Sequence, residues 1–439
     1  MLIDDLAPVA YTDELVSAIA ARIRDGRLPP GTQLPSIRAL AAAVELSPGS
    51  VATAMRTLGS RGLIVSTQGK RSVVADLARL PVSYLSTVPT GLVDLSSVEP
   101  DPDLLPAVAS YLDDSLYSPS LYDATNVIAE LDEVVRRGFE ADGVVGELTA
   151  TNGALDALER ILSARLHPGD VVLVEDPCWG SQRTLLQVLG CEAVGVAIDD
   201  EGFVPADLAK RLAQRRVAAI IHTPRGQNPT GSALSAERER ELLRVLEAYP
   251  DVLVVEDDHL SGVASAPFRT LTAGRSAWAV VRSFSKTLGP DLRLAVAAMD
   301  RDTTDRVQMR QLIGPGWVSH LTQRLAARVL NDPVAQDRIS RAAASYDERR
   351  ELLIQVLARS GIAARGVCGF TVCVPVPFEA EVVAALARKG WAVQAGEPYR
   401  LDSPPFIRVC VSPLNAGGVL EFATALVGVM LTPRRALRR

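Results

Sequence analysis

Residues 283–295, SFSKTLGPDLRLA, decide the fold expected of this chain. Lys286 follows an apolar run and stands among Ser, Thr, Gly and Pro residues, which are typical of a turn at the end of a strand. An amine that is partly desolvated there has a lowered pKa and can form a Schiff base with a carbonyl compound. Ser283, Ser285 and Arg293 are close in sequence and can bind an anion. A surface lysine in a turn fits the same stretch, so the interpretation depends on the neighbouring motifs.

Short β-branched runs surround this stretch, and each is followed by turn residues and a helical segment. They are VVLVED (171–176), AAIIHT (218–223), VLVVED (252–257) and AVVRSF (279–284). Strands that alternate with helices in this way form a mostly parallel sheet with helices on both faces. The sequence therefore predicts a large α/β domain. A smaller C-terminal α/β domain is expected from about residue 337, where the helix–strand pattern changes.

Four more motifs place small, polar or aromatic residues directly after predicted strands. These motifs are TNGALDALERIL (151–162), EDPCW (175–179), RGQNPTG (225–231) and VVEDDH (254–259). The turn before the first helix presents N–H groups to a phosphate, and Trp179 can stack on a flat heterocycle. Asn228 lies in a sharp turn, and Asp257 can pair with a protonated ring nitrogen. A helix cap, a core tryptophan, a turn and a solvated acid pair are the plain alternatives, so the order of the motifs matters more than any one of them.

In that order the motifs resemble the fold-type I pyridoxal-phosphate enzymes of the class I aminotransferase group, over nearly all of residues 95–430. The resemblance implies pyridoxal 5′-phosphate as the cofactor and Lys286 as the lysine of its internal aldimine. It also implies that Arg408, in PPFIRVCVS, clamps a substrate or effector carboxylate through a bidentate pair. The other cofactor residues that it implies are Asp257 at the ring nitrogen, Asn228 at the 3′-oxygen, Trp179 stacked on the ring, Gly153, Ala154, Ser283 and Arg293 around the phosphate, and Tyr122 reaching the phosphate from the neighbouring subunit.

Residue 259 departs from the family pattern. Members of the family usually have a tyrosine there, which hydrogen-bonds the 3′-oxygen of the cofactor, whereas this chain has His259. Imidazole is shorter than phenol and titrates near neutrality. We therefore count His259 among the cofactor-binding residues, and the sequence leaves open whether transamination occurs.

The N-terminal part has a different pattern, which indicates three short helices and a hairpin. Leu15, Ile19 and Ile23 form one apolar stripe, and Ser36 and Ser47 can each cap a following helix. The runs LIVS and RSVV flank TQGK and predict a two-stranded wing with a basic tip. From position 15 to position 79 there are nine basic and three acidic residues, whereas the whole chain carries a net charge of −6. A basic module on an acidic body indicates that this part binds a polyanion.

This arrangement predicts a winged helix-turn-helix that binds double-stranded DNA. The third helix would enter the major groove, while basic residues around it would contact phosphates or the minor groove. The residues we expect at DNA are Arg38, Ser50, Thr53, Arg56, Lys70 and Arg71. The alternative is a three-helix protein-interaction domain with a solvated basic face.

Residues 26–70 resemble the DNA-binding domain of GntR-type bacterial repressors, most closely in the loop from Pro29 to Ala41. The family usually has Ser-Arg before its recognition helix, and this chain has Ser47-Pro48, so one phosphate-contacting arginine is absent. A GntR-like winged helix fused to an aminotransferase-like domain is the layout of the MocR/GabR subfamily of transcription regulators. That resemblance covers almost the whole chain.

The combined resemblance implies four segments: a winged helix (1–78), a linker (79–95), a large pyridoxal-phosphate domain (96–336) and a small C-terminal domain (337–439). It implies a homodimeric regulator that senses pyridoxal phosphate, or a small effector with an amino group, through the aldimine at Lys286. A catalytically active aminotransferase that retains a GntR-like domain is the main alternative. The other is a regulator whose large domain holds no cofactor and serves only for dimerisation.

Composition excludes several classes of protein. Of 439 residues, 48% are hydrophobic and 22% charged, which is too apolar for a disordered chain. No apolar run approaches the roughly 20 residues that span a bilayer, and the first ten residues do not have the basic start of a signal peptide. The five cysteines show no CxxC spacing, so neither a metal site nor a disulfide framework is expected. We expect a cytoplasmic protein with no membrane partner.

Overall fold

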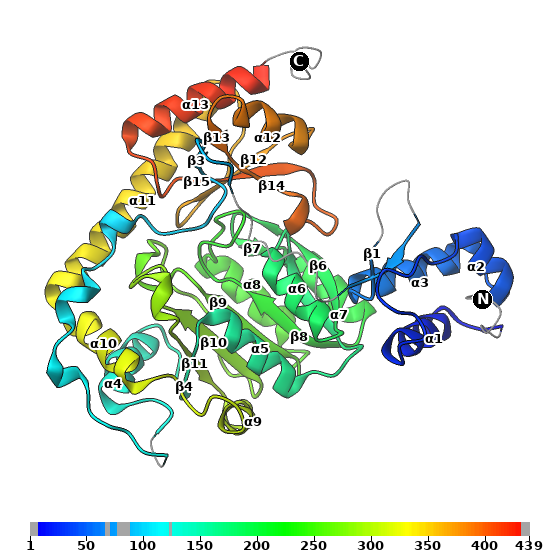
Figure 1. Cartoon of the computed structure of the whole chain (residues 1–439), viewed down its shortest axis with the longest axis horizontal. Coiled ribbons are helices and arrows are strands. Elements are labelled where there is room, and N and C mark those ends of the chain that lie inside the picture. The colour runs from blue at the N-terminus through cyan, green and yellow to red at the C-terminus, as the bar shows by residue number, and fades with distance from the viewer. Residues whose placement is uncertain (1–7, 66–70, 77–87, 123–124, 432–439) are drawn as a thin grey trace. The chain divides into compact units, whose positions relative to one another are not determined.

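The structure is a computed structural model, and it describes residues 8–65, 71–76, 88–122 and 125–431 (Figure 1). The chain forms two compact units. One comprises residues 1–85, 166–172 and 180–194, and the other comprises residues 86–165, 173–179 and 195–439. Among the described residues, no helix is long and apolar enough to cross a membrane.

The N-terminal segment has the three helices and the hairpin that the sequence predicts. They are α1 (Thr12–Arg24), α2 (Ile37–Val44), α3 (Pro48–Ser60), β1 (Ile64–Val65) and β2 (Val73–Val74). The predicted caps are present, because Ser36 Oγ accepts a hydrogen bond from the backbone N–H of Ala39 and Ser47 Oγ accepts one from Ser50. The strands pair antiparallel, with Ile64 opposite Val74. The tip of the predicted wing, residues 66–70, lies outside the described residues.

A small apolar core holds these helices together. The inward faces of all three helices contribute side chains that are at most 2% exposed, namely Leu15, Val16, Ile19, Leu40, Val44, Val51, Ala54 and Leu58. Because the core is built from residues repeating every three or four positions, the opposite face of α3 remains free for polar side chains.

The body of the chain is built on a sheet that has eight strands among the described residues, in the order β4-β11-β10-β9-β8-β5-β6-β7. The strands are β4 (Glu147–Thr151), β5 (Val171–Asp176), β6 (Glu192–Asp199), β7 (Gly202–Phe203), β8 (Val217–His222), β9 (Leu253–Asp258), β10 (Trp278–Ser283) and β11 (Ala295–Met299). The central strands β8, β9 and β10 run parallel, whereas β11 runs antiparallel to both of its neighbours. The predicted parallel strands agree closely with the observed ones.

Helices flank this sheet (Figure 1). They are α4 (Ala129–Ala141), α5 (Ala154–Arg165), α6 (Gly180–Val188), α7 (Pro205–Gln214), α8 (Ala236–Leu246), α9 (Arg301–Leu312) and α10 (His320–Asn331). Short 3₁₀ helices lie at η3 (Pro102–Leu104), η4 (Val108–Tyr111), η5 (Asp114–Leu116), η6 (Ser261–Val263), η7 (Pro290–Leu292) and η8 (Glu397–Tyr399). The β-branched side chains of β8, β9 and β10 are at most 9% exposed, as expected for strands covered on both faces.

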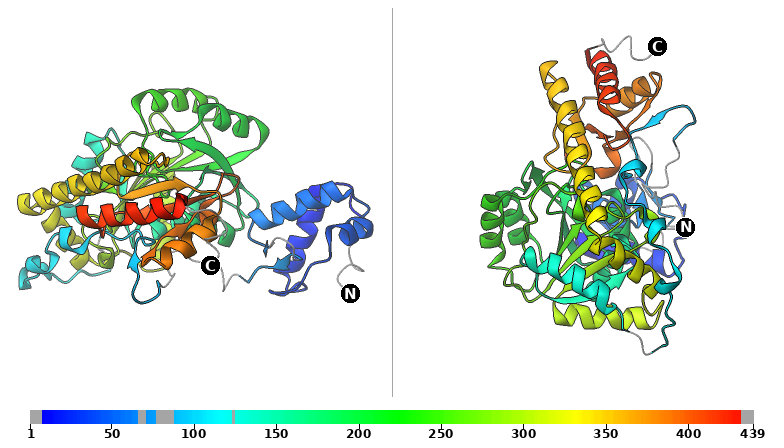
Figure 2. Two further views of the ribbon diagram at one scale, coloured as in Figure 1. Left: turned by 90° about the horizontal axis from the view of Figure 1, so that it is seen from above. Right: turned by 90° about the vertical axis from the view of Figure 1, so that its left-hand side faces the viewer.

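The C-terminal part begins with the long helix α11 (Pro333–Arg359) and has a small sheet of its own. Its strands β12 (Thr371–Pro375), β15 (Phe406–Cys410) and β14 (Gln394–Ala395) are antiparallel and stand in that order. The other elements are α12 (Glu379–Ala387), β13 (Trp391–Ala392) and α13 (Ala416–Leu431). Helices α11 and α13 lie side by side (Figure 2).

The end of the predicted linker (79–95) pairs with this C-terminal part. Strand β3 (Val93–Asp94) runs parallel to β13, with Val93 opposite Trp391. The next backbone carbonyl, that of Leu95, accepts a hydrogen bond from the N–H of Cys410 in β15. The chain therefore passes from the linker to the C-terminal sheet before it enters the rest of the body.

Candidate functional site

Three of the predicted site residues lie where the parallel strands end. Asp257 is the second-last residue of β9 and lies opposite Val281 of the neighbouring strand β10. Ser283 ends β10, and Lys286 follows it in the next turn. In open α/β sheets, ligands bind at the carboxyl ends of the strands. The chain thus places these three residues at the edge where a ligand site is expected.

Lys286 lies among charged groups in a poorly hydrated position. Its Nζ donates a hydrogen bond to the backbone carbonyl of Val98. Burial lowers the pKa of Lys286, and the cations of Arg408 and Arg293 lower it further, against the opposite effect of Glu99. A lysine with a lowered pKa has a larger fraction of the unprotonated amine, which is the nucleophilic form.

Gly153 and Arg293 make a tight cradle at the start of α5. Gly153 has φ +94°, a conformation that L side chains rarely adopt, so this position favours glycine, and a Cβ there would also displace the guanidinium of Arg293. Arg293 has φ +46°, and its Nη2 donates to the carbonyl of Asn152 at 3.2 Å. Helix α5 begins at Ala154. A guanidinium beside a helix N-terminus is suited to a phosphate.

Arg408 connects Asn228, a predicted site residue, with Tyr399, which the sequence did not reveal. Its Nη1 donates to Asn228 Oδ1 at 3.1 Å and to the hydroxyl of Tyr399 at 2.7 Å, and its Nη2 donates to the carbonyl of Ser96. Arg408 is 2% exposed, and its Nε has no acceptor among the residues that the structure describes. A buried N–H donor in this state can bind an incoming anion.

His259 is a neutral imidazole with a defined tautomer. Its Nε2 lies 2.9 Å from the carbonyl of Gly226, and since a carbonyl can only accept, Nε2 carries the hydrogen. Burial, together with the neighbouring cation of Lys286, lowers the pKa of His259 to about 4. At neutral pH, Nδ1 is therefore a hydrogen-bond acceptor, whereas the tyrosine of related enzymes offers a hydroxyl.

The two predicted aromatic residues lie in different surroundings. Trp179 follows β5 and packs against a cluster of Cys373, Tyr399 and Phe406, which places it near the partners of Arg408. Tyr122 has a 99% exposed side chain that contacts the ring of Trp317 edge-to-face. The single chain therefore does not bring Tyr122 to the strand-end group.

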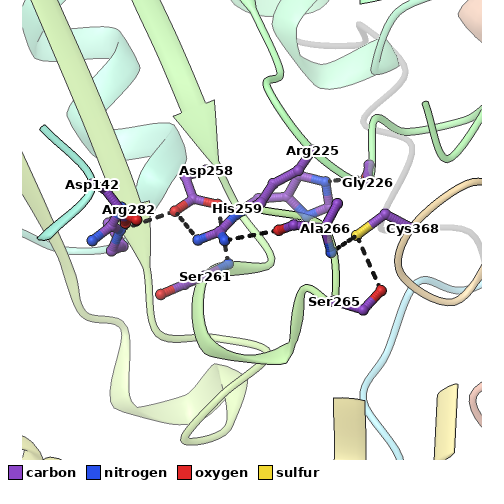
Figure 3. Close-up of polar contacts among 10 residues, drawn as sticks. All are labelled: Asp142, Arg225, Gly226, Asp258, His259, Ser261, Ser265, Ala266, Arg282 and Cys368. Atoms are coloured by element: carbon purple, nitrogen blue, oxygen red, sulfur yellow. Dashed lines mark hydrogen bonds and ion pairs between the residues drawn. The ribbon is translucent and has the colours of Figure 1, made fainter. Parts of the chain in front are cut away.

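A buried ion network fixes the end of β9 (Figure 3). The carboxylate of Asp258 accepts from Arg225 Nε at 2.8 Å and from Arg282 Nε at 2.9 Å, and Arg282 also pairs with Asp142 at 2.6 Å. Burial alone would raise the pKa of Asp258, but the two arginines hold it below its usual value. Successive side chains of a strand point to opposite faces. Anchoring Asp258 on one face therefore orients Asp257 towards the other.

Sequence reasoning missed Asp258 and Tyr399. The strand period contained the signal for Asp258, because residues 256 and 258 share a face that Asp257 does not. No comparable signal marks Tyr399, which meets Arg408 only through the folding of the loop between η8 and β15.

The residues expected at DNA lie on α2, on α3 and beside the wing. Thr53 and Arg56 are exposed on α3, and Arg56 Nη2 donates to Thr53 Oγ1 at 2.9 Å. Ser50 is half-buried, and its Oγ lies 2.9 Å from that of Ser47 at the helix start. Arg38 on α2 and Arg71 before β2 are exposed. Lys70 lies outside the described residues.

Comparisons with known proteins identify both halves of the chain. Residues 91–426 match the family of class I and II aminotransferases, and residues 11–74 match the gntR family of bacterial regulatory proteins. The vitamin B6 salvage pathway transcriptional repressor PtsJ of Salmonella typhimurium is 38% identical over 92% of this chain and 94% of its own length. The chain belongs to the MocR-type GntR regulators.

More distant relatives agree with this assignment. The pyridoxine biosynthesis regulator PdxR of Corynebacterium glutamicum is 28% identical over 80% of this MocR-type chain and 79% of its own. Among solved structures, a kynurenine aminotransferase of Pyrococcus horikoshii in complex with PMP has a TM-score of 0.72 at 20% identity, over 78% of this chain and 92% of its own. That likeness shows the fold-type I architecture.

The MocR-type chain is thus a DNA-binding transcriptional regulator that depends on pyridoxal 5′-phosphate. Its own residues fit this cofactor. The site has an amine of lowered pKa, a glycine cradle beside a guanidinium for a phosphate, and a buried carboxylate, Asp257, at the neighbouring strand end. The bound cofactor supplies an aldehyde that condenses with primary amines and a pyridine ring that withdraws electrons.

We predict that Asp258→Asn strongly destabilises the body of the chain. The change leaves Arg225 and Arg282 buried without the carboxylate that both contact, which typically costs about 3–5 kcal/mol. Urea unfolding followed by circular dichroism measures the loss. Asp302→Asn is the control, because Asp302 also pairs with arginine but its side chain is 59% exposed. Equal, small losses in both variants would contradict the structural importance of the network.

We predict that His259 makes the protein less stable as the pH falls from about 6.5 towards 4. In this range the unfolded chain binds a proton at this residue and the folded chain does not, because the folded pKa is about 4. Urea unfolding between pH 7 and pH 5 measures the slope, and His259→Gln should flatten it. In the control His167→Gln, the replaced side chain is 88% exposed, so the slope should stay as in the wild type. The idea fails if both variants keep the wild-type slope.

Proposed function

We propose that this regulator attaches pyridoxal phosphate at Lys286 and changes its affinity for a double-stranded DNA operator when the site is occupied. Residues 1–78 would bind DNA, residues 79–95 would form the linker, and residues 96–336 and 337–439 would form the two parts of the sensor. Because the relative PtsJ is named as a repressor of vitamin B6 salvage, we further propose vitamin B6 genes as targets. Such a protein acts in the cytoplasm, where operator DNA lies.

One observation carries the coupling of site to DNA. Two cations of the candidate site donate to the segment that follows the predicted linker, Lys286 to the carbonyl of Val98 and Arg408 to that of Ser96. A ligand that engages either cation competes for the same N–H groups. A ligand shifts an equilibrium between two states only when it interacts differently with each of them. Competition for these N–H groups provides such a difference.

The proposed roles of the remaining residues follow from their chemistry. The carboxylate of Asp257 would keep a proton on the ring nitrogen, and the side-chain amide of Asn228 would donate to the ring oxygen while Nδ1 of His259 would accept beside it. The ring face would be covered by Trp179. The phosphate would be bound by Gly153, Ala154, Ser283 and Arg293, with Tyr122 contributed by a second subunit.

Arg408 supports an effector that carries a carboxylate beside its amino group. Its buried Nε lacks an acceptor in the described part of the chain, and a guanidinium binds a carboxylate through two parallel hydrogen bonds. The vitamin itself and a small amino acid are the two effector classes that we propose. Binding of pyridoxal phosphate alone would leave the hydrogen bond from Arg408 to the carbonyl of Ser96 intact, whereas the carboxylate of an amino acid would replace that carbonyl as the acceptor.

A homodimer is supported by exposed apolar side chains near Tyr122. Leu121 and Tyr122 are largely exposed, as are Leu312 and Ile313 at the end of α9, and Trp317, which Tyr122 contacts, follows them. Exposed apolar side chains that gather in one patch typically mark a protein interface. Two winged helices in one dimer would bind two half-sites of an operator.

A second function, aminotransferase catalysis, is supported by the retained set of Lys286, Asp257, Asn228 and Arg408. Steady turnover of an amino donor with a keto acid, at roughly 1 per second or faster, is typical of enzymes and would favour it. Single-turnover reaction without steady turnover would favour sensing. If the purified chain binds no pyridoxal phosphate, the body serves only for dimerisation and the proposal is wrong.

We predict that Lys286→Ala abolishes the visible absorbance of the bound cofactor and leaves the protein folded. The amine that forms the covalent bond is lost, while the residues around it remain. Absorption spectra after gel filtration measure the effect, and circular dichroism checks the fold. Lys210→Ala, at an exposed position of α7, should absorb as the wild type does. Visible absorbance that persists in Lys286→Ala would refute the assignment.

We predict that Arg38→Ala weakens DNA binding and reduces its salt dependence. Removing one cation that neutralises a phosphate should reduce the slope of log K against log salt by about 0.9. Titration of the upstream intergenic DNA at several salt concentrations measures this slope. Arg301→Ala is the control, because Arg301 lies on α9 in the body and is 81% exposed. Equal slopes in both variants would mean that Arg38 does not face DNA.

We predict that Arg408→Ala abolishes the response to amino acids while the cofactor content stays normal. The side chain that would pair with the effector carboxylate is lost, whereas Lys286 is unchanged. A panel of amino acids is titrated while the absorption spectrum and DNA binding are followed together. A response as strong as that of the wild type would show that the effector is not held by this arginine.

A further inference from the structure

Gln227 is a fully buried side chain with every hydrogen-bonding group engaged. Its Nε2 donates to Glu175 Oε2 at 3.0 Å and to the carbonyl of Pro177 at 2.8 Å. Its Oε1 accepts from the backbone N–H and from the hydroxyl of Thr230, at 3.0 and 2.7 Å. The exposed fraction of Gln227 is 0%. A buried amide with four well-formed hydrogen bonds has one orientation, so it can set distances between the groups it joins.

Glu175, the anion that Gln227 contacts, is itself fixed from a second strand. Glu175 is in β5, is 2% exposed, and its Oε1 accepts from His222 Nδ1 at 3.0 Å and from the N–H of Thr223 at 2.9 Å. Strand β8, which ends at His222, is the neighbour of β5 in the sheet. The carboxylate of Glu175 therefore links the ends of two adjacent strands, and Gln227 donates a hydrogen bond to this carboxylate.

The two loops that Gln227 joins each carry a proposed cofactor residue. Pro177 lies two positions before Trp179, in the loop after β5. Asn228 is the next residue after Gln227, in the turn that Thr230 closes. Trp179 and Asn228 thus stand on separate loops, and their spacing depends on groups that bridge these loops. The amide of Gln227 is such a bridge.

We propose that Gln227 is a positioning residue, which holds Trp179 and Asn228 at the spacing that a flat heterocycle requires. The inference rests on the proposed function of those two residues. It goes beyond that function, because Gln227 itself would touch neither cofactor nor effector. A purely structural role would make Gln227 matter for stability and not for cofactor binding.

The test compares two buried glutamines. Gln323 is also 0% exposed, and it bonds the backbone of Asn126, Ile128 and Val318, away from the loops of Trp179 and Asn228. Gln227→Leu and Gln323→Leu each leave buried partners unsatisfied and should lose stability to a similar extent. Equilibrium dialysis of the apoprotein against pyridoxal phosphate then measures cofactor affinity, and urea unfolding measures stability.

The expected result is that Gln227→Leu binds pyridoxal phosphate about tenfold or more weakly than the wild type, which corresponds to about 1.4 kcal/mol, whereas Gln323→Leu binds normally. Equal affinities in the two variants overturn the proposal, whether both are weakened or both are unchanged. If the wild type binds no cofactor, the proposed function itself fails. The two failures are therefore distinguishable.

A second variant keeps the proposal falsifiable if Gln227→Leu does not fold. Gln227→Glu has nearly the same shape, but it places a carboxyl beside Glu175. The carboxylate of Glu175 is hydrogen-bonded to His222, and His222 lies opposite Glu256 of β9. A protonated carboxyl can donate its one hydrogen to Glu175 and accept from Thr230, and it loses only the bond to the carbonyl of Pro177. Two carboxylates, in contrast, repel each other. Cofactor affinity relative to the wild type should therefore fall as the pH rises. A pH-independent ratio contradicts the positioning role.

Discussion

The carboxylate of Asp258, held between Arg225 and Arg282, is the constraint on which the arrangement of the site depends. It is completely buried, so loss of this carboxylate would leave Arg225 buried without its anionic partner and Arg282 with only Asp142. A buried pair of this kind contributes little net stability, but it tolerates only one geometry. It thereby fixes the end of β9, and with it the directions of Asp257 and His259. The geometry of the ligand site thus depends on the buried ion pairs of Asp258 with Arg225 and Arg282.

A second buried carboxylate does the same for the neighbouring strands. Glu175 in β5 receives hydrogen bonds from β8 and from the turn that follows it, and Gln227 extends this group to the loops of Trp179 and Asn228. The two carboxylates stand in the acidic C-terminal parts of β5 (VVLVED) and β9 (LVVEDD), strands that begin with apolar residues. In this sheet, polar residues at the carboxyl ends therefore determine loop geometry, while the apolar residues determine strand order.

Much of the fold and part of the site could be predicted from the sequence because they depend on local patterns. Lys286 and the Gly153 turn stand in motifs whose residue types already require a strand end or a positive φ. Tyr399 could not be predicted, because its contact with Arg408 arises from the path of a loop. The antiparallel course of β11 also has no local signal, since it is set by which neighbours the strand finds in the sheet. Asp258 is an intermediate case. The alternation of side chains along β9 places it on the face opposite to Asp257, but this could be used only once the register of the strand was known.

The pairing of β3 with β13 has a consequence for how a signal leaves the sensor. The end of the predicted linker, which would tether the DNA-binding domain, pairs through β3 with β13, and the carbonyl of Leu95 accepts a hydrogen bond from Cys410 of β15, the strand that contains Arg408. If the C-terminal part rotates relative to the eight-stranded sheet, the end of the tether, which is paired with β13, moves with it. The strand that would bind an effector carboxylate is therefore also a strand to which the end of the tether is hydrogen-bonded.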